Sequence, residues 1–408
     1  MALPSHTRCL VRLLPLCLAL RLLLPIPAQG QESPPCKLRV GAERMELLLP
    51  LLEGKRVALM VNQTSLVGEA QLHLLDTLLS SGIRVSKVFA PEHGFRGDVD
   101  AGKSVRDGRD LRTGIPIVSL YGRTKKPTPE MLQGVDVLLF DIQDVGARFY
   151  TYINSMYYLM QAAQENGLEM VVCDRPNPND YIDGPMLEAD CKSFVGLLPL
   201  PILHGMTVGE LAEMINGEDW LSPGDSLRCA LTVVPLVGWE HGEPYELPVR
   251  PSPNLPNTRS VTLYPSLCFF EGTGMSVGRG TDRPFCVLGY PNKAYGSYSF
   301  VPRAIQGADS SPLHRGKRCY GVDLSRGEMP RRELSLGWLI HYHRLAKRLG
   351  HKLITRKRFF ELIAGTKQLA RQLDEGLDEA EIRASWQEGL ERFKVRRRLY
   401  LLYPEQRQ

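Results

Sequence analysis

The sequence lacks the short motifs that mark several common classes of enzyme. Its nine cysteines form no C-x-x-C pair, which argues against a zinc ribbon or a thioredoxin-type redox site. No H-E-x-x-H is present, so classical zincin chemistry is excluded. There is no Walker A loop, and the first expected strand is followed by VNQTSLVGEA rather than G-x-G-x-x-G. A nucleotide-dependent oxidoreductase or transferase is therefore disfavoured.

The chain also has little excess charge of either sign. It contains 50 lysines and arginines against 45 aspartates and glutamates. The first thirty residues hold three of the arginines and no acid, so the remainder has 47 basic residues against the same 45 acidic ones. Such a balance is not the footprint of a nucleic-acid-binding protein, and we expect no nucleic-acid partner.

Long apolar runs are absent after the N-terminus. Leu10 to Leu24 is apolar, follows basic residues and precedes the small residues Ala28 and Gly30, which is the order of a secretory signal. Arg21 interrupts the run and makes it a poor membrane span. We predict a signal peptide over residues 1–30, a secreted or periplasmic location, and no stable membrane insertion after cleavage. An uncleaved anchor is the alternative.

Short apolar runs alternate with helical patterns from Lys55 to about Leu236. The strands that we expect span residues 55–62, 84–90, 116–121, 136–142, 169–174 and 198–203. The expected helices span residues 69–79, 151–165 and 207–216, with a short one near Pro129. Runs such as VDVLLFDI are apolar without alternation, as in strands covered on both faces. The sequence therefore predicts an α/β fold with a doubly wound parallel sheet over residues 37–236.

The second half has a different character. Proline and turn residues are dense between residues 238 and 265, and helical periodicity returns at residues 336–345 and 379–390. We predict that residues 237–408 form a smaller α/β or α+β domain packed on the first. The basic run Arg396–Arg398 is interpreted as a solvated face.

Polar residues follow the predicted strands. In an open parallel sheet, ligands bind outside the carboxyl ends of the strands. The residues at those ends are Asn62, Glu92, His93, Arg96, Tyr121, Arg123, Asp141, Gln143, Asp144, Arg148, Asp174, Arg175, Asn177 and His204. Their convergence predicts an active site.

Several of these residues have a second interpretation. Asp141 and Asp174 equally suit helix caps or turns, and Arg148 equally suits a buried partner of Asp144. A functional role is favoured for Glu92, because partial burial on its turn favours the protonated form that an acid catalyst needs. In the glycine-rich stretch GTGMSVGRGT, a tight loop would bring Arg279 and backbone N–H groups to an anionic ligand.

These motifs also resemble a known family. PEHGFRG, SLYG, DIQDVGARFYTY, DRPNP, HGMTVGELA, PSPNLP, FEGTGMSVGRGTDRPF and RRRLYLLY are similar to the exo-β-N-acetylmuramidase family of NamZ-like glycoside hydrolases, formerly a domain of unknown function. The resemblance implies a Rossmann-like N-terminal domain, a smaller C-terminal domain and an active site in the cleft between them. It also implies release of N-acetylmuramic acid from the non-reducing end of peptidoglycan fragments, with a muramyl glycan as the binding partner.

The resemblance implies roles for individual residues. Glu92, in the E-H-G motif, is the expected catalytic acid, with Asp144 as the second carboxylate and Asp174 behind it, unless the acetamido group of the substrate assists. The predicted substrate-binding residues are Asn62, His93, Arg96, Arg148, Tyr152, Asp174, Arg175, Asn177, His204 and Arg279. An arginine among Arg96, Arg148, Arg175 and Arg279 would bind the lactyl carboxylate of muramic acid. No metal or organic cofactor is required.

Two places depart from the family pattern. Glu271-Gly272-Thr273-Gly274 stands where the family reads E-G-T-N, and Glu240-His241 follows Gly238-Trp239 where a basic residue is expected. Both changes bear on substrate detail more than on hydrolysis. The competing hypothesis is a non-catalytic binding protein for peptidoglycan or amino sugars on the same scaffold, and the presence of Glu92 favours the enzyme.

Overall fold

A computed structural model describes residues 37–95, 107–122, 124–225 and 227–406 of the chain. The predicted signal peptide at residues 1–30, Arg96 and Arg123 lie outside the described residues. Residues from Lys37 onward form one compact unit. Among the described residues, no helix has the length and apolar character needed to span a bilayer.

A seven-stranded sheet dominates the N-terminal region, which we take as residues 37–236. The strand order is β11-β8-β7-β1-β4-β6-β5. Neighbouring strands are parallel except for β5, which pairs antiparallel with β6. The bounds are β1 Arg56–Val61, β4 Arg84–Ala90, β5 Gly108–Arg109, β6 Pro116–Ser119, β7 Val137–Asp141, β8 Glu169–Cys173 and β11 Ala230–Val234. The predicted doubly wound parallel sheet is confirmed.

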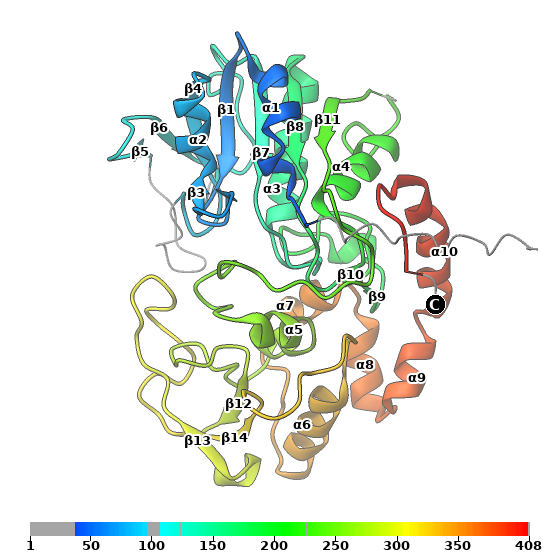
Figure 1. Cartoon of the computed structure of the whole chain (residues 1–408). Coiled ribbons are helices and arrows are strands. Elements are labelled where there is room, and N and C mark those ends of the chain that lie inside the picture. Colours follow the sequence, from blue (N-terminus) through cyan, green and yellow to red (C-terminus); the bar gives the residue numbers. More distant parts are fainter. Residues whose placement is uncertain (1–36, 96–106, 123, 226, 407–408) are drawn as a thin grey trace, which may run out of the picture. The chain divides into compact units, whose positions relative to one another are not determined.

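Helices cover both faces of this sheet (Figure 1). One face packs against 3₁₀ helix η1 (Gly41–Glu43), α1 (Met45–Leu52) and α2 (Leu74–Ser80), and the other against α3 (Tyr152–Asn166) and α4 (Val208–Gly217). The predicted helix 207–216 corresponds to α4, which begins with a capping box: the Thr207 hydroxyl accepts from the Glu210 N–H, and the Glu210 carboxylate accepts from the Thr207 N–H. Burial on both faces explains why the central strands are apolar without alternation.

Three predicted elements differ from the structure. Of residues 198–203, only Leu203 is in a strand, because Pro199 and Pro201 lack the N–H groups that a sheet ladder requires. Leu203 belongs to β10 (Leu203–His204), which pairs with β9 (Ile182–Asp183) outside the main sheet. The unpredicted strand β11 occupies the edge of the sheet instead. The expected helix 69–79 begins at Leu74, after a hairpin of β2 (Leu66–Val67) and β3 (Leu72–His73), and the residues near Pro129 form turns.

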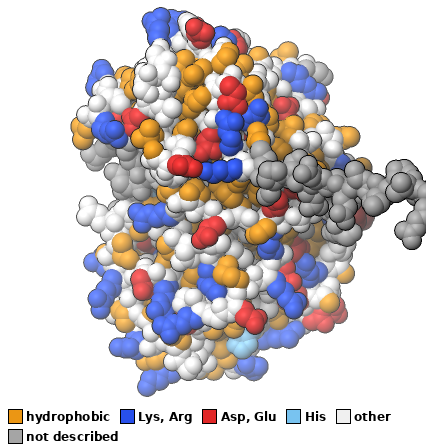
Figure 2. Space-filling model, in the orientation of Figure 1, with side chains coloured by type: hydrophobic (Ala, Val, Ile, Leu, Met, Phe, Trp, Pro, Cys, Tyr) orange, Lys and Arg blue, Asp and Glu red, His pale blue; other side chains and the backbone are white. Residues whose placement is uncertain are grey.

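The C-terminal region contains a small antiparallel sheet and several short helices. The sheet has the order β12-β14-β13, with bounds Val287–Tyr290, Cys319–Asp323 and Tyr298–Phe300 respectively. The helices are α5 Thr258–Leu267, α6 Gly337–Arg348, α7 Lys357–Ala364, α8 Gln368–Glu375, α9 Glu379–Ala384 and α10 Gln387–Arg397. Short 3₁₀ helices are η2 Ala189–Cys191, in the N-terminal region, and η3 Cys268–Gly272, η4 Lys293–Tyr295 and η5 Arg398–Tyr400. The predicted helix 379–390 is thus divided between α9 and α10. Figure 2 shows acidic and basic side chains interspersed on the face that it draws.

Residues 397–403, at the end of α10 and after it, pack against the N-terminal region. The expected solvated run 396–398 contains a buried residue, Arg397, which is 4% exposed and donates from Nε to the Gly205 carbonyl at 2.7 Å. Its exposure was mispredicted because its carbonyl partner lies 192 positions earlier in the chain. The Tyr403 hydroxyl donates to the Asp174 carboxylate at 2.6 Å and accepts from the Leu236 N–H at 2.8 Å.

A buried histidine, His241, lies beside Tyr403. The His241 ring contacts Asp180 through Nδ1 at 2.9 Å and Glu210 through Nε2 at 2.8 Å. Burial alone lowers the pKa of His241, but the hydrogen bonds to the two carboxylates outweigh burial and raise it to about 9. His241 is therefore a cation at neutral pH, in the position where the family resemblance leads us to expect a basic residue.

Candidate active site

Glu92 lies on a tight turn directly after β4. The turn is closed by the Gly94 N–H, which donates to the Pro91 carbonyl at 3.1 Å. His93 adopts a φ of 68° and Gly94 a φ of 79°. The left-handed region is uncommon for a residue other than glycine, and such conformations concentrate at functional sites. The turn places Glu92 at the carboxyl edge of the sheet, close to the point where the strand order reverses around β1.

Two hydroxyl groups hold the Glu92 carboxyl group. The Tyr121 hydroxyl donates to Oε1 at 2.9 Å and the Thr151 hydroxyl donates to Oε2 at 2.8 Å. Burial and the charge of Glu92 raise the pKa of Tyr121 well above its ordinary value, so Tyr121 remains a donor. The Thr151 hydroxyl can rotate to accept instead, so both protonation states of Glu92 keep their hydrogen bonds. The two hydroxyl groups therefore orient the carboxyl group.

Glu92 lines a cavity of about 340 Å³, which lies within the size range of small-molecule sites. Both regions of the chain contribute to this first cavity. Its lining residues are Glu92, His93, Tyr121, Phe149, Tyr150, Thr151, Tyr152, Phe194, Val195, Ser252, Asn254, Leu255, Tyr264, Glu271, Arg279, Phe285 and Phe359. The predicted location, between the N-terminal sheet and the C-terminal region, agrees with this arrangement.

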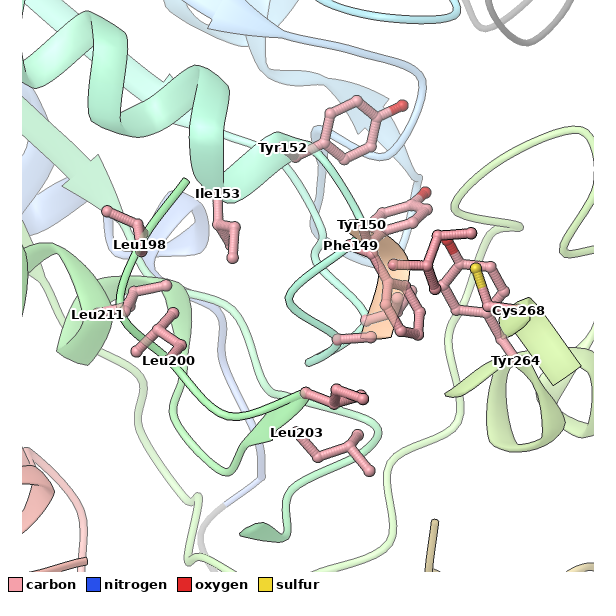
Figure 3. Close-up of a cluster of buried hydrophobic side chains, with 14 of the residues drawn as sticks. Phe149, Tyr150, Tyr152, Ile153, Leu198, Leu200, Leu203, Leu211, Tyr264 and Cys268 are labelled. Atoms are coloured by element: carbon pink, nitrogen blue, oxygen red, sulfur yellow. The ribbon is translucent and has the colours of Figure 1, made fainter. Parts of the chain in front are cut away.

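Aromatic rings make up much of the cavity wall. The Tyr150 and Tyr152 rings meet edge to face with centroids 5.0 Å apart, and Phe149 meets Tyr264 in the same way at 5.3 Å. Figure 3 shows Tyr152, Tyr150 and Phe149 following one another, in this order, toward Tyr264. The Tyr150 hydroxyl donates to the Pro251 carbonyl at 2.9 Å. Interlocked rings give the cavity rigid apolar surfaces with hydroxyl groups at their edges.

An ion pair from the C-terminal region crosses the cavity wall. Arg279 Nε lies 2.6 Å from Glu271 Oε1, and the side chains are 21% and 20% exposed. The Arg279 guanidinium also lies 5.1 Å from the centroid of the Phe285 ring. The structure thus places Arg279 at the cavity, as the glycine-rich loop suggested. Sequence reasoning missed the role of Glu271 as a lining carboxylate, since it named the residue only as part of the FEGTGM motif.

Arg148 does not reach the cavity. It is fully buried, and its guanidinium donates to four backbone carbonyls: Pro185 at 2.9 Å, Leu200 at 2.7 Å, Ile363 at 3.3 Å and Ala364 at 2.8 Å. Burial lowers the pKa of Arg148 to about 9. Arg148 therefore links segments of both regions and does not line the first cavity, where a substrate contact was predicted. It bonds to backbone carbonyls and not, as also predicted, to Asp144.

Asp144 is likewise buried. It is 5% exposed and accepts a hydrogen bond from the Gly146 N–H at 2.6 Å. Burial raises the pKa of Asp144 to about 7. It is not among the lining residues, so the structure does not bring the predicted second carboxylate to Glu92. Arg175 also lies away from the cavity, in a buried ion pair with Asp141 at 2.6 Å.

Asp174 accepts hydrogen bonds from groups at the N-terminus of α4. Its carboxylate accepts from the Thr207 hydroxyl and the Gly209 N–H, both at 2.7 Å. Burial and the nearby Glu210 raise the pKa of Asp174 to about 7. The helix-cap interpretation of this strand-end aspartate is the one that the structure supports.

The remaining predicted residues are also interior. Asn177 donates to the Met206 carbonyl at 3.0 Å. His204 accepts from the Met206 N–H at 3.3 Å, and burial with the nearby Arg397 lowers its pKa to about 4. Asn62 is fully buried and accepts from the Thr64 N–H at 2.9 Å. More of the predicted polar side chains at the strand ends therefore form hydrogen bonds within the protein than line the first cavity.

The cavity brings together only some of the predicted residues. These are Glu92, His93, Tyr152 and Arg279. The cavity does not include Asn62, Asp144, Arg148, Asp174, Arg175, Asn177 or His204, and Arg96 lies outside the described residues. Thr151 could have been found from the sequence, because it precedes α3 in the quoted YTY motif. Phe359 carried no such signal.

Comparison with known proteins places the chain in a family. A model described as "Exo-beta-N-acetylmuramidase NamZ, N-terminal" matches residues 57–259, and its C-terminal counterpart matches residues 262–403. The peptidoglycan β-N-acetylmuramidase NamZ of Bacillus subtilis (strain 168) is 38% identical over 400 residues, which cover 92% of this chain and 94% of the relative.

Solved structures show the same similarity. A DUF1343 family protein from Bacteroides fragilis NCTC 9343 is 43% identical, with a TM-score of 0.82, over 91% of this chain and 100% of the other. A second DUF1343 protein from that organism is 30% identical with a TM-score of 0.74 and the same coverage. The chain therefore belongs to the NamZ family of exo-β-N-acetylmuramidases.

Proposed function

We propose that this protein is a secreted glycoside hydrolase that releases N-acetylmuramic acid from the non-reducing end of peptidoglycan fragments. One observation carries the proposal: Glu92 is held by Tyr121 and Thr151 in the wall of an aromatic-lined cavity. The Bacillus subtilis relative supports the substrate class. The signal-like pattern of residues 1–30 supports export.

Glu92 acts in this proposal as the general acid. It donates its proton to the glycosidic oxygen while the bond between that oxygen and the anomeric carbon breaks. The departing glycan leaves as a neutral alcohol, and a water molecule finally supplies the hydroxyl of the released sugar and returns a proton to the enzyme. The Thr151 hydroxyl accepts a hydrogen bond from the protonated acid and donates one to the carboxylate, so the group keeps its orientation throughout the cycle.

Glu271 takes the place of Asp144 as the second carboxylate in the mechanism that we propose. Among the described lining residues of the first cavity, Glu92 and Glu271 are the carboxylates. Glu271 comes from the C-terminal region, and its pairing with Arg279 holds it in place. It would activate the attacking water or attack the anomeric carbon itself. Participation of the acetamido group of the substrate would leave Glu271 a supporting role.

Among the predicted arginines that the structure describes, Arg279 is the best placed to bind the lactyl carboxylate. Arg148 and Arg175 are occupied by buried partners, whereas Arg279 lines the cavity and keeps N–H groups beyond the one bonded to Glu271. A guanidinium can bind a carboxylate through two parallel hydrogen bonds. Arg279 would thereby distinguish muramic acid from glucosamine, which lacks the lactyl group.

The test is sugar release from a β-1,4-linked N-acetylmuramyl–N-acetylglucosamine disaccharide. We expect free N-acetylmuramic acid from the wild type and a loss of about a thousandfold in kcat for Glu92→Gln. Glu130→Gln, on an exposed turn away from the cavity, is the matched control and should retain full activity. Binding without cleavage by wild type would instead support the binding-protein hypothesis, and equal cleavage by Glu92→Gln would remove Glu92 from the mechanism.

Export is tested separately. We expect the protein in the extracytoplasmic fraction of its source cells, with a mature N-terminus near residue 31. An intact Met1 on protein recovered from the cytoplasm would contradict the proposal.

A further inference from the structure

A separate cavity lies in the C-terminal region, where the end of α6 and the chain that follows it meet α7 and α8. Its volume is about 470 Å³, within the size range of small-molecule sites. We call it the lysine cavity, and its lining residues are His343, Lys347, His351, Lys352, Leu353, Ile354, Thr355, Lys357, Ala370 and Asp374. None of these described residues lines the first cavity. The mechanism proposed for Glu92 therefore makes no use of the lysine cavity.

Positive charge is concentrated in this cavity. Lys347, Lys352 and Lys357 line it, and Asp374 is the acidic residue among the lining groups. The Asp374 carboxylate is already engaged, because its Oδ1 lies 3.0 Å from Nε2 of the buried His343. Lys347 Nζ donates to the backbone carbonyl of Asp374 at 3.3 Å. Within the described ranges of the chain, none of the three lysines forms an ion pair with a carboxylate, so their charges are available to a ligand.

The helix ends account for only part of this arrangement. Lys347 lies in the last turn of α6, where the negative end of the helix dipole favours a cation. Lys352 lies beyond that helix, and Lys357 is the first residue of α7, where the positive end of the dipole disfavours a cation. The described first turn of α7 contains no acidic residue that would offset the charge. A bound anion would offset it.

The lining also indicates the class of anion. The ammonium group of lysine is a compact point charge that suits phosphate, and a phosphate monoester carries a charge of about −1.5 to −2 at pH 7. A carboxylate brings only one negative charge to the three lysines. The rest of the lining includes the Thr355 hydroxyl and the apolar side chains of Leu353, Ile354 and Ala370. These groups suit the organic part of a phosphate ester, for which the volume of the cavity leaves room.

We propose that the lysine cavity binds a phosphate group as the recognised part of its ligand. Lys352 and Lys357 contact the phosphate oxygens, and Lys347 adds a third positive charge from the side of α6. A phosphorylated sugar or polyol and free phosphate share this chemistry, and the apolar and hydroxyl lining favours the ester. The site is independent of the proposed glycosidase activity, because the two cavities have different lining residues.

The test is isothermal titration calorimetry of the purified protein in a phosphate-free buffer. The probes are glucose 6-phosphate, inorganic phosphate and glucuronate, which keeps the sugar ring but carries a carboxylate at C6. We expect glucose 6-phosphate to bind at least about tenfold more tightly than glucuronate. Combining Lys352→Gln with Lys357→Gln should raise the Kd for glucose 6-phosphate at least about tenfold, because two charged donors are lost. The matched control combines Lys293→Gln with Lys317→Gln, two exposed lysines that line neither cavity, and should leave the Kd unchanged.

The source of the phosphate group follows from the same titrations. A lower Kd for glucose 6-phosphate than for inorganic phosphate would identify an ester as the ligand, and equal Kd values would identify free phosphate. Glu92→Gln protein should bind glucose 6-phosphate as tightly as wild type, since Glu92 lies outside the lysine cavity. Weaker binding in this variant would place the ligand in the first cavity and overturn the inference.

Other results would also overturn it. Absence of binding by all three probes would show that the cavity holds no phosphate. Equal Kd values for glucuronate and glucose 6-phosphate would show that it does not distinguish phosphate from a carboxylate. An unchanged Kd in the Lys352→Gln, Lys357→Gln protein would place the phosphate elsewhere. If that combined variant does not fold, Lys357→Gln alone is compared with Lys293→Gln in the same titration.

Discussion

Replacing Arg148 by methionine should destabilise the protein and leave substrate recognition nearly intact. The substitution keeps the length of the aliphatic stem but removes all N–H donors. The buried carbonyls of Pro185, Ile363 and Ala364 then lose their partner, whereas the Leu200 carbonyl keeps the Leu187 N–H. An unsatisfied buried acceptor costs about 1–3 kcal/mol, so the lower bound for three acceptors is about 3 kcal/mol. With a sensitivity of about 2 °C per kcal/mol for a chain of this size, the thermal midpoint should fall by about 6 °C.

Differential scanning calorimetry and steady-state kinetics on the same samples test this expectation. Arg344→Met is the matched control, because Arg344 also donates to backbone carbonyls but is exposed, and it should lower the midpoint by less than about 1 °C. We expect the Arg148→Met protein that remains folded at 25 °C to have a KM close to that of wild type. An unchanged midpoint with a KM raised more than about tenfold would refute the reasoning and return Arg148 to the substrate site.

Three further outcomes are expected. The pKa of His241 is about 9 in the folded protein and 6.5 in the unfolded chain, so its contribution to stability should be complete below pH 6.5 and lost as the pH rises to 9. The difference in thermal midpoint between wild type and His241→Gln should therefore shrink between pH 6 and pH 10. A constant difference would contradict this expectation. Glu271→Ala should lower kcat by a factor of about a hundred or more, with partial recovery in azide or formate, which can enter the space left by the carboxylate, whereas full activity would leave the second step to the acetamido group of the substrate. Gly365→Ala should reduce the thermal midpoint, because its φ is 75° and a Cβ would collide with Nη2 of Arg148; an unchanged midpoint would show that the guanidinium can move aside.

The sheet was largely predictable from the sequence, because burial on both faces leaves apolar runs that can be read directly. The predicted strand 84–90 coincides with β4, and the predicted strand 136–142 includes all of β7. The failures were local. Proline removed the expected strand at residues 198–203, and the edge strand β11 escaped notice because only part of it is buried.

The candidate site was only partly predictable, because a polar residue at a strand end can face a ligand or a backbone carbonyl. Which of these it does depends on distant segments. Arg148 bonds Ala364, 216 positions later, and Asp174 bonds Tyr403, 229 positions later. Glu271 enters the first cavity from the other region of the chain, and nothing in its local sequence indicates that it lies near Glu92. The local sequence pattern thus predicted the edge of the sheet where the site lies. Which residues line the cavity is determined by packing between segments that are distant in the sequence.

The hydrogen bonds of Tyr403 have a consequence for how the chain acquires its structure during synthesis. The strands of the sheet that supports Glu92 all precede residue 235, but Asp174 and the Leu236 N–H bond to Tyr403, which is synthesised 229 and 167 residues after them. The N-terminal region therefore cannot complete its core while it is being synthesised, in contrast to proteins whose domains fold in turn. A fragment limited to residues 57–259 should remain incompletely folded. The smallest independently folding unit is then the two regions together.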